Sequence, residues 1–261
     1  MRILLTNDDG VFAASLWPLY RELTELGDVT VVAPHTEQSG VGHAITYREP
    51  ITADRVRVNG HPPAHAVGGT PADCVKFALL HLMPEKPDLV VSGINPGLNL
   101  GPNIFYSGTV AAAMEAAMYG VEGVAISCDP AVVDTYSTMA EQALRVLRTI
   151  RALNTRRSHA LVFNVNLPSQ PRQAEIVFTR HWQESFDERY AISHSEADTL
   201  YQLELPAESG SPTEKCDVTT VANSDISVTP LRPNLTDTRT LQDLRAAAAN
   251  PGHTPAAESN P

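Results

Sequence analysis

Apolar residues follow two spacings along the chain, one typical of buried strands and the other of amphipathic helices. Residues 1–6 (MRILLT) form a short apolar run that ends at Asn-Asp-Asp-Gly. Residues 15–26 have apolar side chains at helical spacing, and residues 28–33 (DVTVVA) form a second apolar run that stops before Pro34. This order predicts strand, helix and strand, as in a parallel sheet with a right-handed crossover.

The same alternation continues to about residue 165. It predicts strands over 88–92, 123–127 and 160–165, and helices over 72–82, 107–119 and 134–153. Strands that alternate with helices favour an α/β fold, in which an open sheet carries helices on both faces.

The pattern changes after Pro168. Runs with strand character at 175–178, 199–205 and 225–229 follow one another without predicted helices, which indicates an antiparallel extension that could serve oligomer contacts. Residues 246–261 lack large apolar side chains and predict a disordered tail.

Composition narrows the class of protein. The 261 residues include 30 acidic and 19 basic side chains, for a net charge of −11, and 43% are hydrophobic. This is typical of a soluble globular protein, and its acidic surface disfavours binding to a nucleic-acid duplex. No apolar stretch is long enough for a membrane span, and the first is too short for a signal peptide. We therefore expect a cytoplasmic protein with no membrane partner.

The cysteines support the same compartment. Cys74, Cys128 and Cys216 include no CxxC pair. Neither a disulfide framework nor a zinc–thiolate site is expected, which fits a reducing cytosol.

Two adjacent acids, Asp8 and Asp9, follow the first predicted strand within the turn Asn7-Asp8-Asp9-Gly10. Ligands of open α/β sheets bind beyond the carboxyl ends of the strands. Neighbouring carboxylates repel each other, and a hard divalent cation relieves that repulsion. The motif also fits a plain turn with solvated aspartates, so by itself it leaves both interpretations open.

Further polar residues are expected at the same edge of the sheet. Ser39 follows the second predicted strand and Asn95 follows the third, and each offers an oxygen ligand. The next helix opens with Ser107, Gly108 and Thr109, where free N–H groups and the helix dipole favour an anion. Alone, Ser107 also fits a simple N-cap.

Together these residues predict one site. Oxygen ligands from Asp8, Asp9, Ser39 and Asn95 suit Mg²⁺ or Mn²⁺ rather than zinc. With a phosphate held at the start of the helix, the arrangement is that of metal-assisted phosphoester hydrolysis.

The histidines give a less specific signal. His35 and His43 lie nearest the predicted site, and either could act as a proton donor. His61 and His65 are four residues apart, but the prolines between them forbid a helix interior, so the pair need not share a face.

The chain resembles the SurE family of stationary-phase survival proteins, which act as 5′/3′-nucleotidases. The resemblance runs from about residue 1 to 237 and rests on six segments: RILLTNDDG (2–10), AP…QSG (33–40), GTPADCV (69–75), SGINPGLNLGPNIFYSGTVAAAMEA (92–116), NVNLP (164–168) and SVTPL (227–231).

The resemblance implies an activity and a site. We expect a divalent-metal-dependent phosphomonoesterase that converts nucleoside monophosphates to nucleoside and phosphate, with 3′-nucleotides and short polyphosphate as further substrates. One Mg²⁺ or Mn²⁺ per subunit would be held by Asp8, Asp9, Ser39 and Asn95. Asp8 and Asp9 would also be catalytic. Substrate would contact Asn95 together with the phosphate-binding residues Ser107, Gly108 and Thr109.

The resemblance also implies an organisation. We expect a Rossmann-like, mostly parallel catalytic core over 1–170 and an oligomerisation arm over 171–245 that returns to the core, followed by the tail. The arm would exchange between subunits and give a homodimer or homotetramer.

The sequence departs from the family pattern at two places. Residues 11–15 read Val-Phe-Ala-Ala-Ser where the family usually has an Ala-Pro-Gly step, which bears on the loop beside the metal. Ser224-Asp225 replace a usual Gly-aromatic pair and bear on the arm. Two rival functions also keep the glycine-rich loops: a nucleotide-binding module without turnover, and an oligomeric scaffold. Neither needs the doubled carboxylate.

Overall fold

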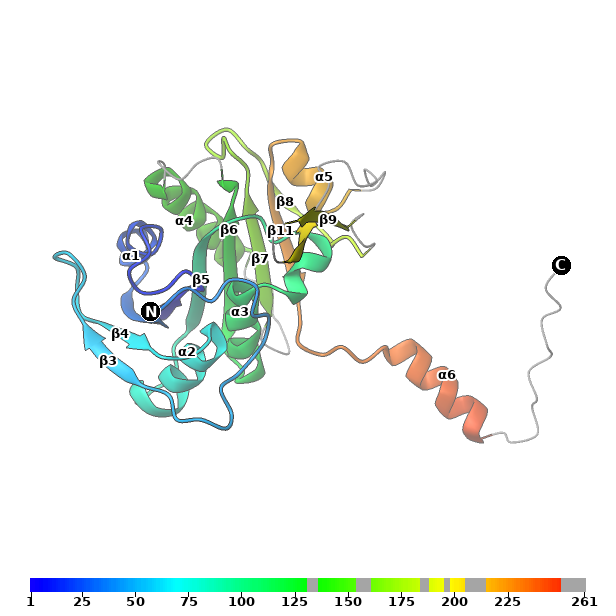
Figure 1. The fold of residues 1–261 in the computed structure, drawn as a ribbon, viewed down its shortest axis with the longest axis horizontal. Coiled ribbons are helices and arrows are strands. Elements are labelled where there is room, and N and C mark those ends of the chain that lie inside the picture. Colours follow the sequence, from blue (N-terminus) through cyan, green and yellow to red (C-terminus); the bar gives the residue numbers. More distant parts are fainter. Residues whose placement is uncertain (131–135, 154–160, 184–187, 195–197, 205–214, 250–261) are drawn as a thin grey trace.

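The computed structural model of the protein describes residues 1–130, 136–153, 161–183, 188–194, 198–204 and 215–249. These residues form a nine-stranded sheet with helices on both faces and a separate two-stranded antiparallel sheet (Figure 1). The predicted α/β class, with a mostly parallel open sheet and an antiparallel extension, is confirmed.

The large sheet is parallel at its centre. Its strands are β1 (Arg2–Thr6), β2 (Asp28–Pro34), β3 (Ala53–Val56), β4 (Ala64–Val67), β5 (Leu89–Pro96), β6 (Glu122–Cys128), β7 (Val162–Leu167), β8 (Ile176–Phe178) and β11 (Ile226–Leu231). Their order is β3-β4-β2-β1-β5-β6-β7-β11-β8. From β4 to β7 every neighbouring pair is parallel, whereas β3 is antiparallel to β4 and β11 is antiparallel to β7. The carboxyl ends of β1, β2 and β5 therefore meet at one edge.

Helices cover both faces of this sheet (Figure 1). They are α1 (Leu16–Leu23), α2 (Pro71–Phe77), α3 (Gly108–Met118), α4 (Tyr136–Ala152), α5 (Asp217–Ala222) and α6 (Thr238–Ala249), with a π-helical turn η1 (Ala78–Leu82) and a 3-10 turn η2 (Gly101–Phe105). Alternate residues of β1 face opposite layers: Leu5 packs in the core with α1 and α4, and Leu4 packs with α2 and α3.

Helix α3 lies against β6 through small side chains. Its buried surface consists largely of alanines, including Ala112, Ala113 and Ala116, which are fully buried. A Cβ on Gly123 of β6 would lie only 2.2 Å from the carbonyl oxygen of Ala113, so the helix and the strand approach each other closely. This contact fixes the height of α3 above the sheet.

The described elements depart from the sequence predictions in several places. Strand β5 continues to Pro96, four residues beyond the predicted end at 92, and so carries Asn95. Helix α1 ends at Leu23 rather than at 26. Strands β3 and β4 and helices α5 and α6 were not expected, and neither was β9 (Arg189–His194), which forms the separate hairpin with β10 (Thr199–Glu204).

The C-terminal region returns to the sheet and then leaves it. Strand β11 pairs with β7, and α6 stands away from the body with none of its described residues buried (Figure 1). Residues 246–249, at the start of the predicted disordered tail (246–261), belong to α6. Residues 250–261 lie outside the described part.

Candidate metal and phosphate site

The acidic pair lies in a turn that its own neighbours fix. Asn7 Oδ1 accepts a hydrogen bond from Gly10 N at 3.1 Å, and Asn7 Nδ2 donates to Gly10 O at 3.0 Å. Gly10 has φ +100°, a conformation that favours glycine, and a Cβ there would lie 3.2 Å from Pro34 O. The turn therefore holds Asp8 and Asp9 at the carboxyl end of β1.

Asp8 is bound to the start of α3. Its side chain is buried, with 3% of the residue exposed. Asp8 Oδ1 accepts from Thr109 Oγ1 at 2.6 Å and Oδ2 accepts from Thr109 N at 3.1 Å. Burial raises the pKa of Asp8, and the bonds from Thr109 offset only part of that rise. The helix N-terminus thus anchors a carboxylate that burial alone would disfavour.

Asp9 has a buried oxygen that the described residues do not satisfy. Its Oδ2 has no hydrogen-bond partner among them. The pKa of Asp9 is raised to about 7, mainly by burial and then by the negative charges of Asp8 and Glu37. A bound cation would supply the missing partner and remove the repulsion.

Ser39 and Asn95 line a cavity next to Asp8. The cavity has a volume of about 540 Å³ and is lined by Asp8, Ser39, Gly40, Asn95, Pro96, Leu98, Asn99, Asn103, Tyr106, Ser107, Glu188 and Leu203. Asn95 Nδ2 donates to Gly97 O at 2.6 Å, which leaves Oδ1 as the ligand atom. Ser39 Oγ donates to Glu37 Oε1 at 2.7 Å, so its lone pairs remain for a cation.

The three residues predicted to bind phosphate at the start of α3 differ in their surroundings. Ser107 lines the cavity and caps the helix, with its Oγ accepting from Val110 N at 3.1 Å. Thr109 is fully buried and bonded to Asp8. Gly108 lies between Asp8 and Pro71: a Cβ there would lie 3.0 Å from Asp8 Cβ and 3.1 Å from Pro71 Cγ. A glycine is therefore needed for the helix to approach the acidic turn.

The donor set fits a hard divalent cation. The described residues contain no group of three or more His, Cys, Asp or Glu side chains arranged to hold a metal. The candidate ligands are instead two carboxylates with a hydroxyl and an amide oxygen. This set suits Mg²⁺ or Mn²⁺, which keep water or phosphate oxygens in their remaining positions.

The histidines lie elsewhere. His43 Nε2 is 2.7 Å from Glu115 Oε2, and the ring of His35 packs against Phe12 with centroids 6.0 Å apart. Neither lines the cavity beside Asp8. His61 stacks on Trp17 and His65 lies against Phe77, so the structure does not bring this pair together.

The sequence prediction did not include the residues that support the loop after β5. Asn99 N donates to Asn166 Oδ1 at 2.8 Å, Asn99 Nδ2 donates to Ser127 Oγ at 2.8 Å, and Asn99 O accepts from Asn164 Nδ2 at 2.7 Å. All four side chains are buried. Two asparagines inside the otherwise apolar run at 162–167 were the available signal.

Comparison with known proteins shows the family to which the chain belongs. The family described as "Survival protein SurE" matches residues 3–188. The chain belongs to the SurE family. "5'-nucleotidase SurE" of Syntrophobacter fumaroxidans is 43% identical over 94% of this chain and 98% of that protein. The protein of the same name from Rhodopirellula baltica is 41% identical over the same shares. The crystal structure of SurE protein from Aquifex aeolicus has a TM-score of 0.81 at 32% identity, over 95% of this chain and 100% of that one. The sequence resemblance is thereby confirmed.

The first departure from the SurE pattern leaves the acidic turn ordered. Val11 N donates to Pro34 O at 2.8 Å, and Val11 O accepts from Trp17 Nε1 at 3.2 Å. The segment is therefore held on both sides before α1 begins.

Among the described residues, no helix has the length and apolar character to cross a membrane.

The second departure, Ser224-Asp225, includes a residue with a strained backbone. Ser224 has φ +64°, in the left-handed region that favours glycine. We expect Ser224→Gly to stabilise the protein by about 0.5–1 kcal/mol, because only glycine adopts this conformation freely. Chemical denaturation measures the difference. Asn223→Gly is the control: its φ is −84°, so that glycine would bring loss rather than gain.

The effect of the raised Asp9 pKa on stability can be tested in the metal-free protein. Its folded pKa of about 7 lies above the ordinary value of 3.8, so Asp9 lowers the stability of the fold progressively as pH rises between these values, and the loss is complete above pH about 7. In EDTA at pH 8, Asp9→Asn should raise the melting temperature by about 2–4 °C, with a smaller difference at pH 5.5. Thermal unfolding monitored by circular dichroism measures this, and an equal melting temperature at pH 8 would contradict it.

Proposed function

We propose that this SurE protein is a divalent-metal-dependent 5′-nucleotidase that hydrolyses nucleoside monophosphates to nucleoside and phosphate. The names of its relatives support the activity. The observation that carries it is that Asp8, Ser39 and Asn95 line one cavity with Ser107 at the start of α3. Asp9 does not line this cavity, but it follows Asp8 directly and has a buried oxygen that lacks a partner among the described residues.

The residues divide the work as follows. Asp8, Asp9, Ser39 and Asn95 would hold one Mg²⁺ or Mn²⁺. Bound there, such an ion neutralises phosphoryl charge and makes a water more acidic. Thr109 orients Asp8 through two hydrogen bonds and fixes its distance from the helix. One of the two aspartates takes part in proton transfer.

The phosphate is proposed to bind at the start of α3. Ser107 lines the cavity there, and the first N–H groups and the dipole of the helix favour an anion. Gly108 keeps the backbone within reach because it has no side chain. Donors aimed at the phosphoryl oxygens stabilise the charge that shifts in the transition state.

The rest of the cavity suits a nucleoside. A volume of about 540 Å³ falls in the range of small-molecule sites. Pro96, Leu98, Tyr106 and Leu203 provide apolar wall next to the phosphate end. Activities on 3′-nucleotides and short polyphosphate are further proposals that rest on the resemblance.

Assembly is also part of the proposal. The residues of β9 and β10 are almost all exposed, including Tyr190, Ile192, Leu200 and Tyr201. A twelve-residue helix with no buried residue, such as α6, is marginal in water by itself. We propose that residues 171–245 form an arm that makes a homodimer or homotetramer in the cytoplasm, and light scattering in solution tests the oligomeric state.

The function is tested by phosphate release. The purified protein should release phosphate from AMP and GMP with Mn²⁺ or Mg²⁺, and EDTA should abolish the release. The same assay with 3′-AMP and tripolyphosphate tests the further substrates. AMP binding without release would favour a sensing module, and neither binding nor release would favour a scaffold.

A further inference from the structure

Ser39 lies in a long connection between β2 and β3. Residues 35–52 contain turns and bends but no helix or strand, and most of their side chains are exposed. Gly40 and Gly42 have φ of +74° and +58°. Such a segment has little intrinsic order, so the place of Ser39 depends on the contacts that tether the chain around it.

Two backbone hydrogen bonds tether the chain beside Ser39. Gln38 N donates to Asp8 O at 2.7 Å, and Gly42 N donates to Tyr106 O at 2.9 Å. The first joins the segment to the acidic turn and the second joins it to the end of η2. Both acceptor residues, Asp8 and Tyr106, also line the cavity, so the two bonds tie the segment to the walls of the candidate site.

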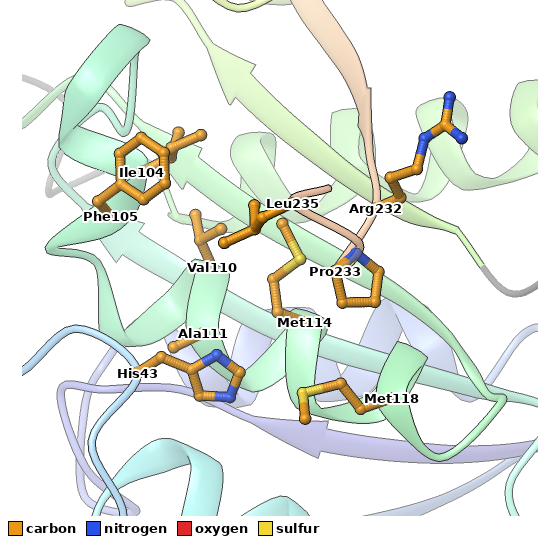
Figure 2. Close-up of a pocket in the computed structure, with 10 residues that line it drawn as sticks. All are labelled: His43, Ile104, Phe105, Val110, Ala111, Met114, Met118, Arg232, Pro233 and Leu235. Carbon is orange, nitrogen blue, oxygen red and sulfur yellow. The ribbon is translucent and has the colours of Figure 1, made fainter. Parts of the chain in front are cut away.

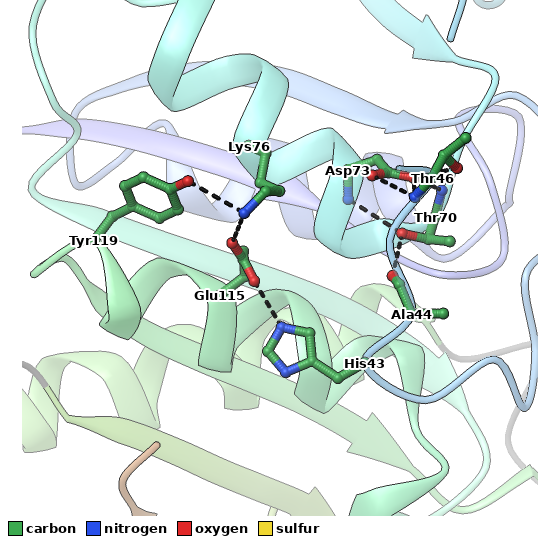
Figure 3. Close-up of polar contacts among 8 residues, drawn as sticks. All are labelled: His43, Ala44, Thr46, Thr70, Asp73, Lys76, Glu115 and Tyr119. Atoms are coloured by element: carbon green, nitrogen blue, oxygen red, sulfur yellow. Dashed lines mark hydrogen bonds and ion pairs between the residues drawn. The ribbon is translucent and has the colours of Figure 1, made fainter. Parts of the chain in front are cut away.

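Side chains tether the segment further along (Figure 3). Thr46 N and Oγ1 donate to Asp73 at 3.0 and 2.7 Å. Thr70 Oγ1 donates to Ala44 O at 2.7 Å. Asp73 also caps α2 through Thr70 N, so this end of the segment is attached to the start of a helix.

The central tether is His43. Its Nε2 lies 2.7 Å from Glu115 Oε2, and Lys76 Nζ donates to Glu115 Oε1 at 2.7 Å and to the Tyr119 hydroxyl at 3.2 Å (Figure 3). The Glu115 side chain is only 3% exposed. Burial raises the pKa of Glu115, but the hydrogen bonds from His43 and Lys76 outweigh it and the net pKa is lowered. Glu115 is therefore a charged acceptor, whose hydrogen bonds are stronger than neutral ones.

Helix α3 thus holds both parts of the candidate metal site. Thr109 at its start binds Asp8, and Glu115, less than two turns further along, binds the segment that carries Ser39. We propose that His43 is a positioning residue: through Glu115 it fixes the segment 38–46 to α3 and so sets Ser39 at the cation-binding edge of the cavity. The proposal rests on the proposed function in taking Ser39 as a ligand.

The surroundings of His43 explain why a side chain with both an N–H donor and a flat aromatic ring suits this place. Its ring also lines a smaller cavity of about 200 Å³, whose walls are mainly apolar side chains such as Ile104, Met114 and Leu235 (Figure 2). Alanine would remove the donor and widen this cavity. Glutamine would keep an N–H donor at a similar reach.

The test compares His43→Ala, His43→Gln and Tyr47→Ala. Tyr47 is the matched control because it belongs to the same segment and is 86% exposed. Hydrogen exchange of residues 38–46 in the metal-free protein should be about ten-fold faster in His43→Ala, as expected for loss of one charge-assisted bond. Mn²⁺ binding by calorimetry should weaken about ten-fold, while kcat at saturating Mn²⁺ changes less than about three-fold. Glutamine should restore both readouts and the Tyr47 variant should match the wild type.

The outcomes separate the two proposals. Unchanged exchange in His43→Ala overturns the tether, and faster exchange with unchanged Mn²⁺ affinity overturns the positioning of Ser39. If the alanine variant does not fold, failure of glutamine to preserve wild-type exchange and affinity likewise overturns the proposal. A wild-type protein that binds Mn²⁺ but releases no phosphate contradicts only the proposed function, because exchange and Mn²⁺ binding need no turnover.

Discussion

Asp8→Asn is expected to lower the rate of phosphate release from AMP in Mn²⁺ by at least about 10³-fold. The variant loses one of the two carboxylate charges of the candidate cation site, so only Asp9 remains as a charged ligand and the cation is held less tightly. The local fold should survive, because asparagine Oδ1 can still accept from Thr109 Oγ1, the shorter of the two bonds to Asp8.

Phosphate release, Mn²⁺ calorimetry and circular dichroism together check this result. Asp54→Asn is a suitable control, since it removes the same charge from an exposed position on β3. The control should keep its activity and its Mn²⁺ affinity. Equal phosphate release by wild type and Asp8→Asn would remove the metal hypothesis.

Asp217→Ala is expected to destabilise the protein by roughly 3–5 kcal/mol. The Asp217 side chain is fully buried. Its Oδ2 accepts from Gly101 N at 2.8 Å, and its Oδ1 accepts from Trp182 N and Val218 N at 2.9 Å each. Each buried N–H left without this acceptor costs about 1–3 kcal/mol.

The same substitution should reach the candidate site. Gly101 opens η2, next to the cavity-lining residues Asn99 and Asn103, so KM for AMP should also rise. Urea denaturation measures the stability, and Asp225→Ala is the control, because Asp225 makes one exposed bond to Glu175 N. That control should lose less than about 1 kcal/mol. A loss of similar size in both variants would show that Asp217 is not a special anchor.

Hydrophobic spacing was enough to predict the central sheet. Strands β1, β2, β5, β6 and β7 are largely buried and appear as mostly apolar runs. Strand β3 (ADRV) is mostly exposed at the sheet edge and α6 has no buried side chain, so neither has a strong apolar pattern. Their positions depend on tertiary contacts and backbone pairing, which single-sequence patterns do not encode.

The candidate site was predictable where topology alone decides. Residues that follow parallel strands meet at one edge, and the structure brings Asp8, Ser39 and Asn95 there. The bonds that hold them were not predictable. Thr109 and Asp8 are 101 residues apart in sequence, and Glu115 and His43 are 72 apart, with no local signal linking either pair. Whether these residues bind the metal stays a prediction for the experiments above.

The alanine surface of α3 has a consequence for distant substitutions. Ala112 and Ala116 are the small side chains through which α3 packs on the core. A larger side chain at either position would therefore push the whole helix away from the sheet. Thr109 at the start of α3 binds Asp8, and Glu115 further along the same helix binds His43. A change in side-chain volume under α3 would therefore shift the residues of the candidate site, so that variants far from any ligand could alter the rate of turnover.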